Sequence, residues 1–109
     1  MEYAEIRQCL VNCRFTDHAR REMETESLGS LHTEEILQAL DSGEIIEEYP
    51  EDKPYPSFLI LGRTVAGRPI HIVCAPVLLE EWLIIITTYQ PDPNRWEPDF
   101  RRRKRSCSA

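Results

Sequence analysis

The most constraining feature of this chain is a set of four apolar runs in its second half, separated by short segments of turn-forming residues. These runs are rich in Ile, Leu, Val and aromatic residues, and they cover residues 44–49, 57–65, 69–77 and 82–89. Such composition is typical of β-strands. The connections are too short for the crossovers that parallel strands require, so the pattern predicts a four-stranded antiparallel sheet.

Helical patterns precede the strands. Apolar residues at helical spacing predict three helices, over residues 4–10, 17–27 and 34–42. Thr16 and Thr33 are favourable N-caps for the second and third of these helices. Residues 13–15 form a connector or a short strand. This order predicts an α+β fold, with the N-terminal helices packed on one face of the sheet and the other face partly open.

The length of 109 residues indicates one domain, which we expect to span residues 1–100. Residues 91–99 are proline-rich and irregular, and Trp96 within them is expected to pack back on the domain. Residues 101–109 are expected to be a disordered basic tail. No oligomeric state follows from these patterns.

Cysteine usage and hydropathy suggest a cytoplasmic protein. The spacing of the four cysteines matches no zinc site, which predicts free thiols and neither metal nor cofactor; they are Cys9, Cys13, Cys74 and Cys107. The acidic N-terminal residues lack the apolar region of a secretory signal. No apolar run reaches the roughly 18 residues of a membrane span, so no membrane association is expected.

The charge distribution is uneven. The net charge is −6, but residues 101–105 carry five of the 13 basic residues and none of the 19 acidic ones. The rest of the chain is therefore strongly acidic and repels nucleic acid at long range. Any RNA chemistry requires a local basic patch.

Two histidines are candidate proton-transfer groups. His71 lies in an otherwise apolar strand, where it points to the opposite face from Ile70 and Ile72. It is either a titrating group suited to acid–base catalysis or a hydrogen-bonded structural histidine. His18 lies in the first turn of a helix, where the alternative to catalysis is local packing or capping.

Three arginines and a tyrosine complete the candidate site. Arg20, Arg63 and Arg68 are candidates for binding a phosphate, because guanidinium groups bind phosphate oxygens in pairs. Solvated surface charges are the alternative for each arginine. Tyr89, at the end of the last strand, is a candidate for orienting a phosphate or stacking on a base, and core packing is its alternative.

Several segments together resemble the family known as domain of unknown function 4258: residues 15–23, 43–50, 61–63, 68–73 and 88–96. That family is similar to the RelE-like and BrnT-like toxins, and it implies a RelE/barnase-like fold and a metal-independent ribonuclease paired with an antitoxin. His18 and His71 match the family's two recurrent histidines, and Arg20 matches an arginine beside the first. Glu22 stands where the family often has a basic residue, which weakens the phosphate-binding role of this helix.

Two functions therefore follow as hypotheses. The first is an endoribonuclease of toxin–antitoxin type, with RNA as substrate and an antitoxin protein as partner. In it His71, His18 and Tyr89 are catalytic, and Arg20, Arg63 and Arg68 bind the substrate. The alternative is a non-catalytic module that binds a protein through the open sheet face or through the acidic run at residues 44–52.

Overall fold

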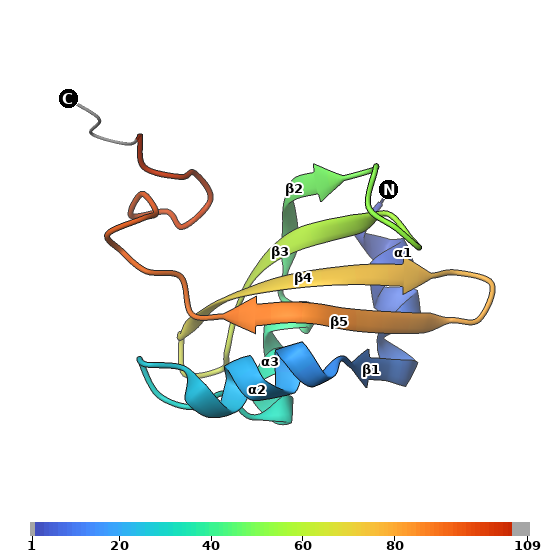
Figure 1. Cartoon of the computed structure of the whole chain (residues 1–109), viewed down its shortest axis with the longest axis horizontal. Helices are drawn as coiled ribbons and strands as arrows, with labels where there is room; N and C mark the ends of the chain where they lie inside the picture. The colour runs from blue at the N-terminus through green and yellow to red at the C-terminus, as the bar shows by residue number, and fades with distance from the viewer. Residues whose placement is uncertain (1, 106–109) are drawn as a thin grey trace.

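The computed structural model describes residues 2–105 as three α-helices, a short 3₁₀ helix and five strands (Figure 1). The first half contains α1 (Tyr3–Gln8), the 3₁₀ helix η1 (Cys9–Asn12), β1 (Cys13–Phe15), α2 (Asp17–Thr25) and α3 (Thr33–Asp41). The second half contains β2 (Glu44–Tyr49), β3 (Ser57–Arg63), β4 (Pro69–Val77) and β5 (Trp82–Tyr89). The chain therefore has the predicted α+β class.

The sheet has five strands in the order β1-β5-β4-β3-β2, and it is mixed. The four predicted strands pair antiparallel in chain order, but β1 adds a fifth strand parallel to β5, with Cys13 opposite Leu83 and Phe15 opposite Ile85. The expectation of a purely antiparallel four-stranded sheet is thus corrected. The physical reason is that β1 satisfies the backbone of one half of β5 while its side chains pack against the core.

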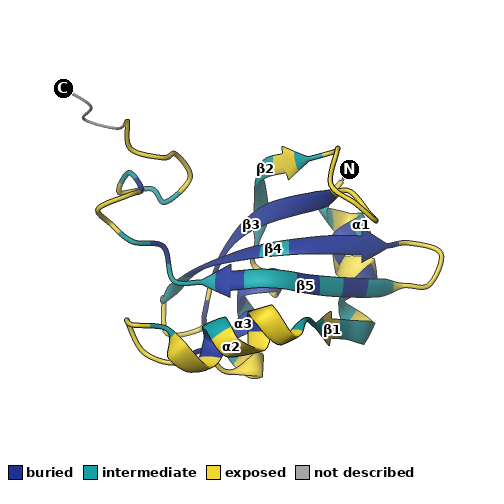
Figure 2. Cartoon of the chain, in the orientation of Figure 1, coloured by how far each residue is buried: buried dark blue, intermediate teal, exposed yellow. Residues whose placement is uncertain are grey.

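The core lies between the helices and one face of the sheet. Helical residues such as Ile36 and Leu40 pack there against Ile60, Ile70 and Ile72, and all five side chains are fully buried. Figure 2 shows the buried residues concentrated on β3 and β4 in the middle of the sheet. Each such aliphatic side chain stabilises the fold by about 1.5–3 kcal/mol relative to its exposure to water.

Close packing of α3 on β3 depends on a glycine. A Cβ atom on Gly62 would lie 1.9 Å from the carbonyl oxygen of Ala39 in α3. Only a residue without a side chain therefore allows the helix to approach the strand this closely.

Local caps position the two longer helices. The Thr16 hydroxyl accepts a hydrogen bond from the backbone nitrogen of Ala19 in the first turn of α2 (3.0 Å), which confirms the predicted cap. The N-cap of α3 is His32 rather than the predicted Thr33. His32 and Glu35 form a reciprocal capping box, which satisfies two free N–H groups at the start of the helix.

The C-terminal segment folds over the sheet face opposite the helices. We call residues 91–105 the C-terminal strap. Within it Trp96 and Arg103 form an antiparallel bridge, flanked by backbone hydrogen bonds from Lys104 to Arg95 and from Glu97 to Arg102 (both 2.8 Å). The expected disorder of residues 101–109 therefore does not extend to residues 101–105, because ion pairs and this bridge hold them. Residues 106–109, including Cys107, lie outside the described part of the chain.

Candidate functional site

The candidate site is centred on His71, in the middle of the sheet. β4 places His71 between Leu61 of β3 and Tyr89 of β5, on the face away from the helices. This orientation agrees with the alternation expected from the sequence. The side chain is nevertheless fully buried, because the C-terminal strap covers this part of the sheet.

Both ring nitrogens of His71 have hydrogen-bond partners. Nε2 lies 2.7 Å from the carbonyl oxygen of Phe100, and Nδ1 lies 3.2 Å from the hydroxyl of Tyr89. A carbonyl oxygen can only accept, so Nε2 carries the proton and Nδ1 accepts a hydrogen bond from Tyr89. The ring of Trp96 packs edge-on against the imidazole, with centroids 4.3 Å apart.

Burial keeps the His71 imidazole neutral. Desolvation lowers the pKa of His71 from 6.5 to about 4, and hydrogen bonding to Phe100 offsets only part of this effect. Burial also raises the pKa of Tyr89, so its hydroxyl keeps its proton. In this closed arrangement His71 has no nitrogen free to exchange a proton with a substrate.

Ion pairs fasten the strap to β2. The guanidinium of Arg103 binds the Glu47 carboxylate through two contacts of 3.0 and 3.1 Å, and it also stacks on the Trp96 ring. Arg101 pairs with Glu44 at 2.7 Å. The hydrogen bond from Arg103 lowers the pKa of Glu47, so the carboxylate stays charged. Because these pairs are partly exposed, each contributes only about 0.2–1 kcal/mol.

Phe100 carries backbone strain at the point where it contacts His71. Its φ is +58°, in the left-handed region that a bulky residue seldom adopts. This conformation costs about 1–2 kcal/mol. Weak ion pairs therefore hold the strap over His71, and the backbone strain at Phe100 opposes this closure.

His18 and Arg20 lie on α2, away from this centre. His18 is exposed, and its Nε2 lies 3.4 Å from Glu22. Arg20 extends over the Phe15 ring. No hydrogen bond or ion pair in the described part of the chain joins either residue to His71. The structure therefore does not bring the two predicted histidines into one cluster.

Glu22 has a structural position that explains why it is not basic. Beyond the end of β1 the edge of β5 is covered by α2, and Glu22 accepts hydrogen bonds from the backbone nitrogen of Thr88 (3.1 Å) and from the Thr87 hydroxyl. One turn later, Glu26 accepts from the backbone nitrogen of Gln90 (3.3 Å). These carboxylates accept the backbone N–H groups at this edge of β5 that a neighbouring strand would otherwise accept.

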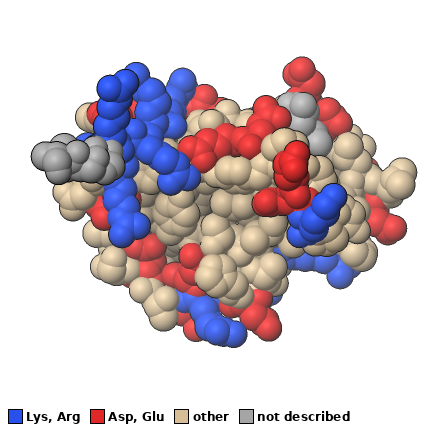
Figure 3. Space-filling model, turned by 45° about the horizontal axis from the view of Figure 1, so that its top comes forward, with Lys and Arg blue, Asp and Glu red and all other residues tan. Residues whose placement is uncertain are grey.

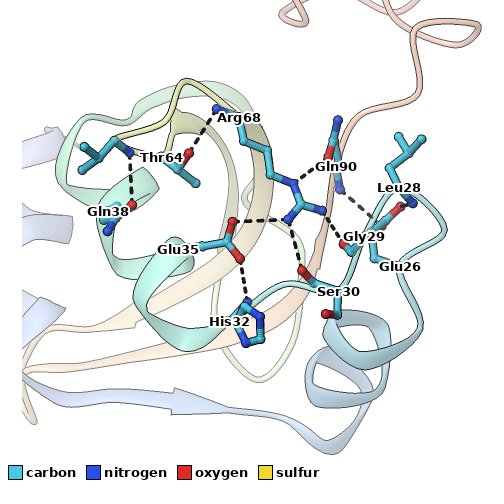
Figure 4. Close-up of polar contacts among 11 residues, drawn as sticks. Glu26, Leu28, Gly29, Ser30, His32, Glu35, Gln38, Thr64, Arg68 and Gln90 are labelled. Carbon is cyan, nitrogen blue, oxygen red and sulfur yellow. Dashed lines mark hydrogen bonds and ion pairs between the residues drawn. The ribbon is translucent and has the colours of Figure 1, made fainter.

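Arg68 is fully engaged within the protein, as Figure 4 shows. Its guanidinium donates to the side chains of Gln90 (2.6 Å) and Glu35 (3.2 Å) and to the carbonyl oxygens of Ser30 (3.1 Å) and Gly29. Four of its five N–H groups are thus used. Arg68 fastens the α2–α3 loop to the ends of β4 and β5, and it has little capacity left for a phosphate.

Arg63 lies beside the strap. Its guanidinium is 5.9 Å from the centre of the Phe100 ring, and it lines a hollow of about 520 Å³ together with Ser42, Asp99 and Arg101. Of the three predicted phosphate-binding arginines, Arg63 is therefore the one placed near the cover of His71.

The strap supplies the local basic patch that the acidic body lacks. Residues 101–105 are brought together at one end of the molecule, where four of them line a hollow of about 650 Å³. Figure 3 shows the densest group of Lys and Arg side chains at this end, at the left of the view. Nowhere in residues 2–105 do three or more His, Cys, Asp or Glu side chains form a group that could hold a metal ion. Among the same residues, no helix is long and apolar enough to span a bilayer.

Of the residues around His71, Tyr89 was predicted from the sequence as a site residue, whereas three others were missed. Phe100, Glu47 and Arg103 gave no signal of their own, since they come from segments far apart in the chain. Trp96 was expected to pack on the domain, and its burial confirms this. A usable signal was the combination of one histidine in an apolar strand with a tryptophan in a proline-rich segment.

Comparison with known protein families matches residues 15–90 to the family described as Domain of unknown function (DUF4258). The match includes His18, His71 and Tyr89, and it ends before the strap begins. No curated protein and no solved structure gives a significant match. The similarity to RelE-like and BrnT-like toxins therefore stays a prediction.

Proposed function

This chain belongs to the family described as domain of unknown function (DUF4258), and we propose that it is a metal-independent endoribonuclease of toxin–antitoxin type. The observation that carries the proposal is the hydrogen-bonded pair of His71 and Tyr89 beneath a basic strap. A buried imidazole bonded to a tyrosine hydroxyl supplies a base and a proton donor side by side. The arginines above it supply cations for a phosphate.

The reaction requires the strap to move away from His71. Loss of the Phe100 carbonyl frees Nε2, and contact with water brings the pKa of His71 from about 4 back towards 6.5, where an imidazole exchanges protons efficiently near neutral pH. The retaining contacts are weak, and opening relieves the strain at Phe100. The five cations of residues 101–105 then remain available to bind the RNA backbone.

In the open state each group has a defined role. In this state the ring proton of His71 lies on Nδ1 and is donated to the Tyr89 oxygen, so Nε2 is the free base. It removes the proton of the 2′-hydroxyl, whose oxygen attacks the adjacent phosphorus. The bond to the 5′-oxygen breaks, and this oxygen leaves with a proton from an acid. The products are a 2′,3′-cyclic phosphate and a 5′-hydroxyl. The Tyr89 hydroxyl donates to a phosphate oxygen, and Arg63 and Arg103 stabilise the added negative charge.

His18 and Arg20 have a less direct place in this proposal. Both are exposed on α2, and His18 contacts Glu22, which in turn binds the backbone of β5 next to Tyr89. An RNA strand that lies across the edge of β5 reaches both residues. They then bind the RNA away from the cleaved phosphate, and a water molecule gives the proton to the leaving oxygen. Arg68 has no role with substrate, because its hydrogen bonds are made within the protein.

The second candidate is a non-catalytic module that binds a protein. It is favoured by one observation, the closed state of His71, in which both ring nitrogens are occupied and the imidazole is neutral. Under this reading His71 and Arg68 are structural residues that hold the strap and the loops. The acidic residues of β2 then form the docking surface.

The test is cleavage of a mixed RNA in EDTA. We would compare the wild type, His71→Asn, Tyr89→Phe and a strap-released Glu44→Gln/Glu47→Gln variant, which loses both ion pairs to the strap but keeps its cations, each checked for native structure by circular dichroism. The proposal expects 2′,3′-cyclic phosphate products, a loss of roughly 10²–10⁴ in rate for His71→Asn, and faster cleavage by the strap-released variant. If neither folded wild type nor the strap-released variant cleaves RNA, the binding module replaces the ribonuclease.

A further inference from the structure

An apolar groove lies at the end of the sheet where β4 turns into β5. It has a volume of about 300 Å³ and is lined by apolar side chains, among them Tyr55, Phe58, Val77, Leu78 and Leu79. The C-terminal strap leaves the sheet near the far end of β5, as Figure 1 shows. The groove is therefore separate from His71 and from the basic patch.

The turn beside this groove exposes leucines. Leu79 at its tip is 99% exposed, and Leu78 is 39% exposed; Figure 2 shows this turn as exposed. Turns of this kind ordinarily hold Asn, Asp or Gly, which tolerate left-handed backbone. Here Glu81 has a φ of +54°. Neither its strain nor the exposed leucines stabilise the isolated chain, so the turn is better suited to presenting these side chains to a partner.

The exposed chain neighbours of the groove form an acidic rim. Glu51 and Asp52 come shortly before Tyr55, and Glu80 and Glu81 follow Leu79, with Lys53 as the single cation among these residues. The carboxylate of Asp52 accepts from Ser57 and that of Glu81 from Gln8, so Glu51 and Glu80 are the two without such a contact among the described residues. An acidic rim repels nucleic acid and anionic bilayers. A second copy of this chain would bring the same carboxylates face to face. Complementary charge instead requires a cationic ligand.

We propose that this groove binds a segment of a partner protein in which apolar residues are flanked by Lys or Arg. The apolar residues fill the groove and cover Leu79, while the flanking cations pair with the carboxylates of the rim. This is the usual layout of a binding surface, with an apolar centre and a charged border. The inference does not depend on the proposed ribonuclease.

The first experiment selects peptides from a displayed random library on the full-length wild-type protein, with counter-selection on Leu79→Lys. Leu79 is exposed, so this substitution should leave the fold intact. Val65→Lys is the matched control, because Val65 is an 87% exposed residue at the β3–β4 turn. We expect enriched peptides with an apolar centre and flanking cations. Enrichment of acidic peptides, or no enrichment that depends on Leu79, overturns the proposal.

The second experiment measures the affinity of the best peptide by fluorescence anisotropy. Leu79→Lys should weaken binding at least roughly tenfold, as expected for a central anchor residue, while Val65→Lys should bind like the wild type. Glu51→Lys/Glu80→Lys should also weaken binding, and added salt should reduce the difference from wild type. Equal affinity of all four proteins overturns the proposal. Self-association of the wild type that Leu79→Lys removes would assign the groove to a second copy and also overturn it.

Discussion

The pKa of His71 reports whether the strap is closed, because the strap buries the imidazole. We predict that Arg103→Ala raises the pKa of His71 from about 4 towards 6.5. Two effects of this change act in the same direction. It removes a nearby positive charge that lowers the pKa, and it removes the bidentate contact to Glu47 and the stacking on Trp96 that hold the strap.

The magnitude follows from the contacts. A partly exposed ion pair contributes about 0.2–1 kcal/mol and a cation–π contact about 0.5–1 kcal/mol. Their loss together weakens closure by about 1–2 kcal/mol, which is roughly a tenfold change in the closed-to-open ratio. If protonation requires opening, a tenfold change raises the apparent pKa of His71 by about one unit.

The pH dependence has a definite sign. Closure lowers the pKa of His71, so protons favour the open state. Closure is fully stabilised above about pH 6.5 and loses about 3 kcal/mol as the pH falls to about 4. The charged groups around the ring are Glu47 on β2 and Arg103 on the strap, with the neutral Tyr89 hydroxyl on β5.

The assay is an NMR titration of the His71 ring resonances in the wild type, Arg103→Ala and Arg102→Ala. Arg102 is the matched control, because its side chain is exposed and, within residues 2–105, pairs with no carboxylate other than that of Asp99 inside the strap. We expect Arg102→Ala to leave the titration unchanged. A wild-type midpoint near 6.5, or an Arg103→Ala midpoint that stays at about 4, would refute the strap as the cause of the depressed pKa.

Three further predictions concern the free energy of unfolding, measured with urea. Gly62→Ala should cost more than about 3 kcal/mol because its Cβ would overlap the backbone of α3, whereas Gly67→Ala should cost about 1 kcal/mol, since its Cβ would meet nothing within 4 Å and only its positive φ is unfavourable; equal losses would contradict the close packing. Arg68→Ala should cost about 2–4 kcal/mol, because it removes four hydrogen bonds. An unchanged free energy of unfolding would show that Arg68 has no structural role. Glu22→Ala should cost about 1–3 kcal/mol, because it leaves a backbone N–H of β5 without its partner; an unaltered unfolding midpoint would reject that role.

Features that depend on residues close together in the chain could be predicted from the sequence. The four apolar runs are the four antiparallel strands, and Thr16 caps α2 because a cap involves residues three apart. β1 was ambiguous because three residues show no reliable alternation. Its pairing with β5 joins positions about 70 residues apart, and no local pattern encodes such a pairing.

The candidate site was harder to predict for the same reason. Alternation placed His71 on the face away from the helices, but the face is closed there by Phe100, which lies 29 residues later in the chain. Arg68 looks like a phosphate ligand in the sequence because its partners come from the α2–α3 loop, from α3 and from the residue after β5, all far from it in the chain. Composition indicated a disordered tail at residues 101–109, whereas Arg101 and Arg103 pair with the acidic β2 and hold the first part of this segment.

The carboxylates of α2 along β5 have a consequence for the behaviour of the protein at high concentration. An uncovered strand edge offers a template on which other chains assemble into extended sheets. Glu22 and Glu26 occupy the free N–H groups of this edge with negative charge, so an incoming strand finds its donors already taken. Sheet extension between molecules is therefore blocked along this part of β5. Loss of either carboxylate should be detected as aggregation of the folded protein before any loss of its secondary structure.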